Sequence, residues 1–289
     1  MLVFPMWVAS ILGSTNIGDA AGAVSRSQSY SGGANGAVEA RSTGENTAAR
    51  RLRTELGRRA SSDGNHVCLD GMAEIEGQFC VDRYEGSLVE ILADGTEQPW
   101  PYYRSPTTDV VTKAVSVPGV YPQGYISGVQ ASAACEASGK RLCSPREWKS
   151  ACMGPRKTTF PYGSERQTGR CNDNGRSSLR FYNPQLDDKP EHRWMWGAGG
   201  NMNDPRLNQM PGTLTRTGER AECTNEYGVF DMVGNLHEWV DDPDGTFQGG
   251  YYLDTHVNGD GCNYRTTAHP SSHHDYSTGF RCCADRSSQ

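Results

Sequence analysis

Hydrophobic and polar residues begin to follow a regular pattern only after the first 63 residues. Phe79 and Val81 alternate with polar neighbours, which predicts a short strand. Further along, Ser127 and Gln130 have the spacing of a helix-capping box, and the helical run after them ends at Gly139, a residue typical of helix C-termini. The pattern therefore predicts a strand and then a helix in the first part of a folded region.

A second helix is predicted directly afterwards. Ser144 and Glu147 form another capping box, with Pro145 at the first helical position. One face of this helix carries residues suited to burial at positions i, i+3 and i+4, namely Trp148, Ala151 and Cys152. The sequence therefore predicts two successive helices after the strand.

The N-terminal part of the chain predicts export. Met1–Leu12 is almost wholly apolar, too short to span a membrane and suited to the core of a signal peptide, and Ala21-Gly22-Ala23 supplies a cleavage site. Residues 24–63 have almost no large apolar side chains, so burial cannot offset the entropy of ordering them. We therefore expect a signal peptide at 1–23, a disordered linker at 24–63 and a folded domain at 64–289, with no membrane span in the mature chain.

Composition narrows the class of protein further. The 289 residues include 34 glycines, the net charge is −6, the pI is about 5.7 and the mean hydropathy is −0.68. These values argue against nucleic-acid or anionic-membrane partners. The 10 cysteines form no paired C-x-x-C knuckles, so a disulfide framework is favoured over zinc. We expect a secreted or periplasmic monomer whose partner is a protein or small-molecule ligand of unknown identity.

The segment 227–242 is the most distinctive stretch of the chain. Its large apolar residues require burial, while Asp231, Asn235 and Glu238 lie among them and cannot be buried without partners. Gly234 permits a sharp turn in the middle. Two carboxylates around such a turn could form an oxygen cage for a hard cation. The alternative is a structural loop held by hydrogen bonds from the backbone to the carboxylates.

The same segment resembles the central motif of the formylglycine-generating enzyme family, the sulfatase-modifying factors, which reads G-x-x-D-M-x-G-N-x-x-E-W. Other parts of the family pattern match at Gly139-Lys140-Arg141-Leu142, at Phe160-Pro161-Tyr162-Gly163 and at Gly279-Phe280-Arg281. The resemblance runs from about Cys68 to Asp285. It implies a loop-rich, C-type-lectin-like fold of the α+β class, stabilised by disulfides and calcium.

Site residues follow from the resemblance position by position. The family's calcium ligands correspond to the side chains of Asp231 and Glu238 and the carbonyls of Gly234 and Leu236. A second calcium site is common in the family near residues 171–223, but its ligands cannot be assigned here. Arg281 is expected to be structural, because a guanidinium can clamp a carboxylate with two hydrogen bonds.

The resemblance also implies two disulfides, Cys152–Cys262 and Cys135–Cys282. Cys68 and Cys80 are expected to pair because they are close in sequence. The remaining four cysteines would form two further bonds whose pairing is left open: Cys143, Cys171, Cys223 and Cys283.

The family's catalytic cysteines have no counterpart in this sequence. Formylglycine-generating enzymes hold copper(I) with two cysteines in the interval that corresponds to residues 251–261, and this interval contains none. One hypothesis is a binding or structural module that has lost the activity. The other is an oxidoreductase with copper or iron held by histidines, for which the candidates are His256, His269, His273 and His274. These histidines could equally line an exposed polar loop.

Overall fold

The structure is a computed structural model that describes residues 67–184 and 201–287. The predicted signal peptide and linker lie outside the described residues. All described residues belong to one compact unit. Within them there is no helix with the length and hydrophobicity that crossing a membrane requires.

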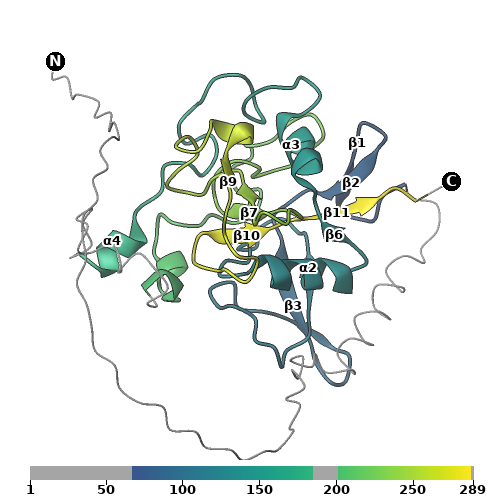
Figure 1. Ribbon diagram of the computed structural model, residues 1–289, viewed down its shortest axis with the longest axis vertical. Helices are drawn as coiled ribbons and strands as arrows, with labels where there is room; N and C mark the ends of the chain where they lie inside the picture. The colour runs from purple at the N-terminus through teal and green to yellow at the C-terminus, as the bar shows by residue number, and fades with distance from the viewer. Residues whose placement is uncertain (1–66, 185–200, 288–289) are drawn as a thin grey trace, which may run out of the picture. The chain divides into compact units, whose positions relative to one another are not determined.

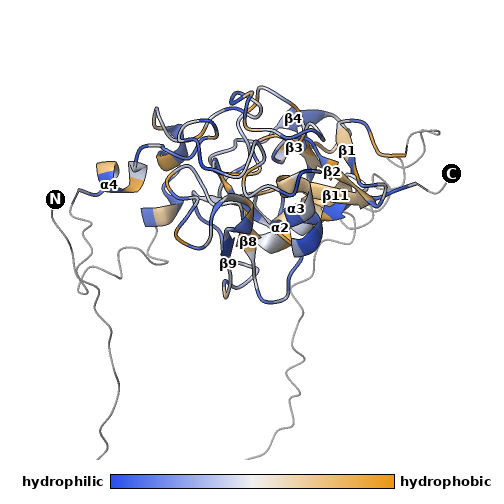
Figure 2. Cartoon of the chain, turned by 90° about the horizontal axis from the view of Figure 1, so that it is seen from above, coloured by the Kyte–Doolittle hydropathy of each residue, from blue (hydrophilic) through white to orange (hydrophobic). Residues whose placement is uncertain are grey.

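One sheet joins the two ends of the folded region (Figure 1). Its four strands are antiparallel, and β11 lies between β2 and β6. The strands in sheet order are β1 (Met72–Ile75), β2 (Phe79–Asp82), β11 (Cys282–Asp285) and β6 (Arg141–Leu142). The strand that the alternation at Phe79 and Val81 predicts is β2, and Figure 2 shows the hydrophobic colours of β1, β2 and β11.

Two further sheets are small. In the second sheet, β10 and β7 are parallel, with Gly279 opposite Glu238. Its strands in order are β10 (Thr278–Phe280), β7 (His237–Trp239), β8 (Phe247–Gln248) and β9 (Arg265–Thr266). The third sheet consists of β4 (Glu97–Pro99), β3 (Ser87–Ile91) and β5 (Thr112–Val115).

Both predicted helices are present. Helix α2 (Gly128–Ala137) begins after Ser127, and α3 (Pro145–Met153) begins after Ser144, each with a complete capping box. Helix α2 ends two residues before Gly139, which has a positive φ of 73°. The other helical elements in the described residues are short: α4 (Ser178–Tyr182), η2 (Asn201–Asn203), η3 (Leu207–Gln209) and η4 (Gly261–Asn263).

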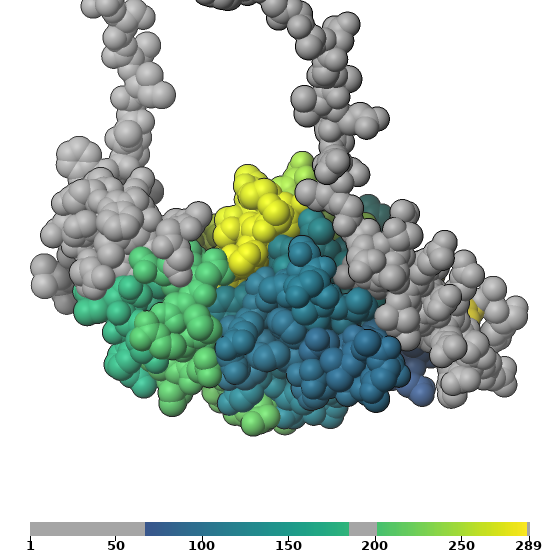
Figure 3. Space-filling model, turned by 90° about the horizontal axis from the view of Figure 1, so that it is seen from below, coloured from purple at the N-terminus to yellow at the C-terminus, as the bar shows by residue number. Residues whose placement is uncertain are grey.

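The segment 227–242 passes through the core. Met232 and Val233 pack in one cluster with Trp148 of α3, whose side chain is fully buried. Leu236 packs in a second cluster with Tyr125 and with residues from η3 and the loop after it. Figure 3 shows that this loop, in green, lies beside the blue-teal segment before α2, where Gly119 N donates to Thr217 O at 2.8 Å.

All ten cysteines are paired, in five disulfides. The three expected pairs are present, with S–S distances of 1.99 Å for Cys68–Cys80, 1.98 Å for Cys135–Cys282 and 1.99 Å for Cys152–Cys262. The pairs left open by the sequence are Cys143–Cys283 and Cys171–Cys223. The adjacent cysteines of β11 therefore attach that strand to α2 on one side and to the start of α3 on the other.

Candidate functional site

A buried ion pair lies at the centre of the domain. Arg281 Nε and Nη2 donate to the two oxygens of Glu238, each at 2.7 Å, and both side chains are almost completely buried. Trp148 Nε1 donates to the same carboxylate at 2.6 Å. Arg281 Nη1 and Nη2 also donate to the carbonyls of Asp82 and Phe230, respectively. Arg281 is therefore the structural clamp that the sequence predicts.

Two more buried carboxylates lie near this pair. Glu85 accepts from Leu236 N at 3.2 Å and from the Asn235 amide at 2.6 Å, and Asp231 accepts from Gly218 N at 2.6 Å. Burial raises the pKa of Glu85 well above its ordinary value, and the nearby charge of Asp231 adds to this effect. Burial likewise raises the pKa of Asp231 to about 7. The Arg281 guanidinium thus lies near the carboxylates of Glu238, Glu85 and Asp231, and burial raises the pKa of Glu85 and of Asp231.

The predicted calcium ligands do not fit a calcium ion in this arrangement. Calcium takes roughly six to eight oxygen ligands, whereas Glu238 is bound on both oxygens by Arg281 and Asp231 accepts from Gly218 N. In the described parts of the chain, no three His, Cys, Asp or Glu side chains are placed to share a metal ion. Calcium binding by Asp231, Glu238 and the carbonyls of Gly234 and Leu236 stays a prediction of the family resemblance. In the structure, the positive charge beside Glu238 is the guanidinium of Arg281.

Backbone conformation and a close contact explain why residue 234 is a glycine. Its φ is +80°, and a Cβ at this position would lie 2.2 Å from the Asn172 carbonyl oxygen. The next residue, Asn235, contacts the same carbonyl group, since Asn235 N donates to Asn172 O at 2.9 Å. The glycine turn therefore serves the close packing of segment 227–242 against the loop around Asn172.

The four candidate histidines do not form one cluster. The rings of His269 and His273 lie 4.8 Å apart, and His273 Nε2 is 3.1 Å from Asp275. His274 instead contacts Asn203 at 3.0 Å, so the adjacent histidines 273 and 274 have different partners. His256 is half exposed and lies 3.3 Å from Asp254.

His237 is a buried histidine that the sequence did not single out. Its ring stacks on Tyr251 at 4.8 Å and its Nδ1 lies 3.3 Å from Ser277 Oγ. Burial lowers the pKa of His237 to about 4, so the ring is neutral near pH 7. This residue is a packing element between aromatic rings, and it is the first residue of the fully buried strand β7.

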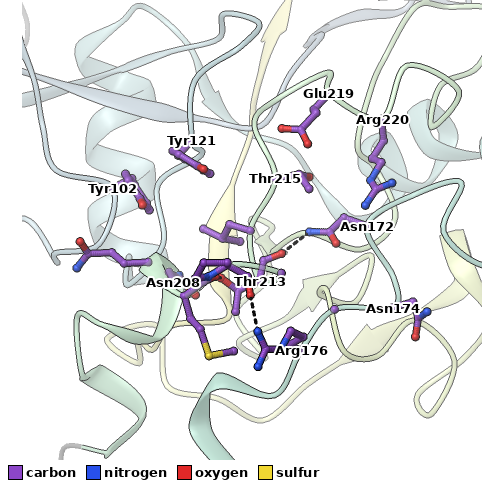
Figure 4. Close-up of a pocket in the computed structure, with 16 residues that line it drawn as sticks. Tyr102, Tyr121, Asn172, Asn174, Arg176, Asn208, Thr213, Thr215, Glu219 and Arg220 are labelled. Carbon is purple, nitrogen blue, oxygen red and sulfur yellow. Dashed lines mark hydrogen bonds between the residues drawn. The ribbon is translucent and has the colours of Figure 1, made fainter. Parts of the chain in front are cut away.

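A pocket of about 450 Å³ opens at the surface between the loop before α2 and the loops around residues 172–176 and 208–220 (Figure 4). Tyr102 and Tyr121 stack in one wall, with centroids 4.6 Å apart, and Arg176 and Arg220 lie across the opening. Buried Asn172, Asn208, Thr213 and Leu214 form its floor. The sequence does not reveal that these walls come together.

Local contacts hold the pocket in shape. Asn172 Nδ2 donates to Thr213 O at 2.9 Å and to Asn235 Oδ1 at 2.8 Å, which joins the floor to segment 227–242. Arg176 N donates to Gly212 O at 2.6 Å. The Cys171–Cys223 disulfide connects the two ends of these loops. The pocket is therefore part of the rigid framework.

The fold and these features define a disulfide-stabilised, loop-rich α+β domain. The family model described as "Sulfatase-modifying factor enzyme 1-like domain" matches residues 103–286, more than half of the chain. The chain belongs to this family, and the predicted family and the loop-rich, disulfide-stabilised α+β fold are confirmed. The comparison with curated proteins gives no match.

Solved structures resemble the chain at low identity. The "Major Tropism Determinant I1 Variant" is 14% identical with a TM-score of 0.43, over 76% of this chain and 54% of that chain. The structure titled "Crystal Structure of CarF" is 14% identical with a TM-score of 0.39, over 83% of this chain and 82% of that chain. The chain thus spans about half the length of the Major Tropism Determinant structure.

Proposed function

We propose that this protein is an exported sulfatase-modifying-factor-like domain that acts as a binding or structural module and does not generate formylglycine. The single observation that carries the proposal is that all ten cysteines are in disulfides, so the chain has no thiol. The family's reaction uses two thiolates that hold copper(I), a soft ion suited to sulfur ligands. A disulfide sulfur cannot serve as such a ligand.

The nearest cysteine to the family's catalytic interval supports the same conclusion. Cys262 follows residues 251–261 directly, but it is bonded to Cys152 of α3 and is completely buried. The spread of the four candidate histidines gives no support to a histidine-bound copper or iron in their place. We therefore prefer the binding module over the metal-dependent oxidoreductase.

Export is part of this proposal. Five disulfides form and persist in oxidising compartments such as the periplasm or the extracellular space, and are rare in the reducing cytosol. The apolar segment Met1–Leu12 supports the same compartment.

The activity test combines a thiol assay with a peptide assay. We expect no reactive thiol in the denatured, unreduced protein. We also expect mass spectrometry to show no conversion of a C-x-P-x-R peptide that is incubated under air with the copper-loaded protein. An active family enzyme is the positive control. Formation of the peptide aldehyde, abolished by Cys262→Ser, would contradict the proposal.

Calcium is tested separately by chelation. Because Arg281 already binds Glu238, we expect a calcium chelator to leave the melting temperature unchanged. A ligand that binds only the native state would raise stability with its concentration. A drop on chelation in the wild type that is absent in Asp231→Asn would instead establish calcium binding at the residues that the family resemblance implies.

A further inference from the structure

We propose that the pocket in Figure 4 binds an acidic saccharide, a short oligosaccharide that contains uronic acid. This inference rests on the proposed function, since it names the ligand class of a binding module. It is carried by unpaired guanidinium groups on one wall, hydroxyl and amide groups around the remaining surface, and a buried acceptor in the floor.

The rim has cationic groups available for a carboxylate. Within residues 67–184 and 201–287, neither Arg176 nor Arg220 is paired with a carboxylate. Each guanidinium bonds to one carbonyl at 3.5 Å, Arg176 to Pro211 O and Arg220 to Gly169 O. Arginine binds carboxylates with two parallel hydrogen bonds. Since the whole chain has a net charge of −6, this cationic rim is a local feature.

The aromatic wall adds to the positive charge. The Cζ atom of Arg216 lies 4.6 Å from the centroid of the Tyr121 ring, and Tyr102 stacks on that same ring. The tyrosine faces are therefore largely occupied by each other and by the guanidinium, and Figure 4 shows the hydroxyl group of Tyr121 directed toward the pocket. This wall offers hydrogen bonds more than a stacking surface.

The rest of the lining matches a ligand rich in hydroxyl groups. Glu219 on the rim accepts from Arg216 N through one carboxylate oxygen, at 3.1 Å, and can accept from a ligand hydroxyl group through the other. No hydrogen bond among the described residues uses the exposed Asn174 amide. In the floor, Asn208 Nδ2 donates to Tyr276 O at 2.6 Å, while its buried Oδ1 accepts no hydrogen bond from the described residues. A buried acceptor without a donor is unfavourable, and a hydroxyl group in the pocket would satisfy it directly or through water.

Size and polarity select a saccharide over other carboxylates. A volume of about 450 Å³ lies in the range of small-ligand pockets and has room for one or two sugar rings. Few lining side chains are apolar, mainly Met210, Pro211 and Leu214, so a fatty acid or a hydrophobic peptide side chain would find little to bury against. The disulfide-anchored walls need little reordering, which lowers the entropic penalty of binding.

The test is a calorimetric titration of the disulfide-intact protein with trigalacturonic acid and with its fully methyl-esterified form. The two probes have the same rings and hydroxyl groups but differ in charge. We expect the acid to bind at least about tenfold more tightly than the ester, because charge-assisted hydrogen bonds are lost in the ester. Binding of the acid should weaken as salt rises from about 0.05 to 0.5 M.

Variants assign the binding to this pocket. Arg176→Gln combined with Arg220→Gln should weaken acid binding by about tenfold or more, while leaving the weak binding of the ester and the melting temperature unchanged. Arg156→Gln, which removes an exposed charge paired with Glu226 elsewhere, is the matched control and should bind like the wild type.

Three results would overturn the assignment. They are no binding of the acid, equal binding of acid and ester, and an unchanged affinity in the folded Arg176/Arg220 double variant. Equal affinity for an acetylated tri-glutamate peptide would overturn the saccharide class. None of these results produces the peptide aldehyde that would contradict the proposed function, so the two proposals fail separately.

Discussion

Arg281→Met is expected to lower the free energy of unfolding by about 3 to 5 kcal/mol, the usual effect of breaking a buried ion pair by removing one partner. The substitution would leave Glu238 buried without its guanidinium, close to the carboxylates of Glu85 and Asp231. It would also remove donors from the carbonyls of Asp82 and Phe230. Measured by thermal unfolding, the loss corresponds to roughly 6 to 20 °C for a domain of this size.

The matched control is Arg141→Met. Like Arg281, Arg141 forms ion pairs, in its case with Glu147 and Asp285, but its side chain is 37% exposed. Exposed ion pairs contribute about 0 to 1 kcal/mol, so this variant should be much less affected. A double variant, Arg281→Met with Glu238→Gln, should recover part of the stability because the uncompensated charge is gone. Equal losses for Arg281→Met and Arg141→Met would show that burial of the pair is unimportant.

Removal of the Cys135–Cys282 disulfide by alanine substitution at both positions is expected to destabilise the domain by about 3 kcal/mol in the chain-entropy model. The bond joins residues 147 positions apart and attaches α2 to β11, but the Cys143–Cys283 bond remains in this variant and closes almost the same loop. The unfolded chain therefore gains only the conformational freedom of the short ring between the two bonds, about ten residues. Unfolding in denaturant under non-reducing conditions measures the difference.

The control is the same pair of substitutions at Cys68 and Cys80, which are only 12 positions apart. The model predicts a similar loss of about 3 kcal/mol for that loop. A much larger loss in the Cys135/Cys282 variant than in the Cys68/Cys80 variant would mean that packing at the alanines, and not loop closure, determines the effect.

In segment 227–242, the sequence predicts which residues are buried but not which residues they contact. Asp231 and Glu238 were recognised as carboxylates that need partners in a buried loop, and both are buried. Their partners were not apparent, because Arg281 is 43 positions from Glu238 and Gly218 N is 13 positions from Asp231. The family resemblance implies calcium at these carboxylates, which stays a prediction, and the fold supplies a guanidinium to Glu238 and a backbone amide to Asp231.

The sequence by itself determined the features that depend on neighbours a few residues apart. Both helices begin at the predicted capping boxes, at Ser127 and Ser144, because each box is closed by hydrogen bonds between positions three apart. The family pattern also identified the fold, since its motifs extend over most of the domain.

Only the tertiary structure decided which distant residues meet. It paired Cys143 with Cys283 and Cys171 with Cys223, which the sequence had left open. It also brought Tyr102 to the same pocket as Arg220, from loops that no periodicity connects. Such contacts depend on how loops pack across the core, and this packing produces no regular spacing of residues in the sequence.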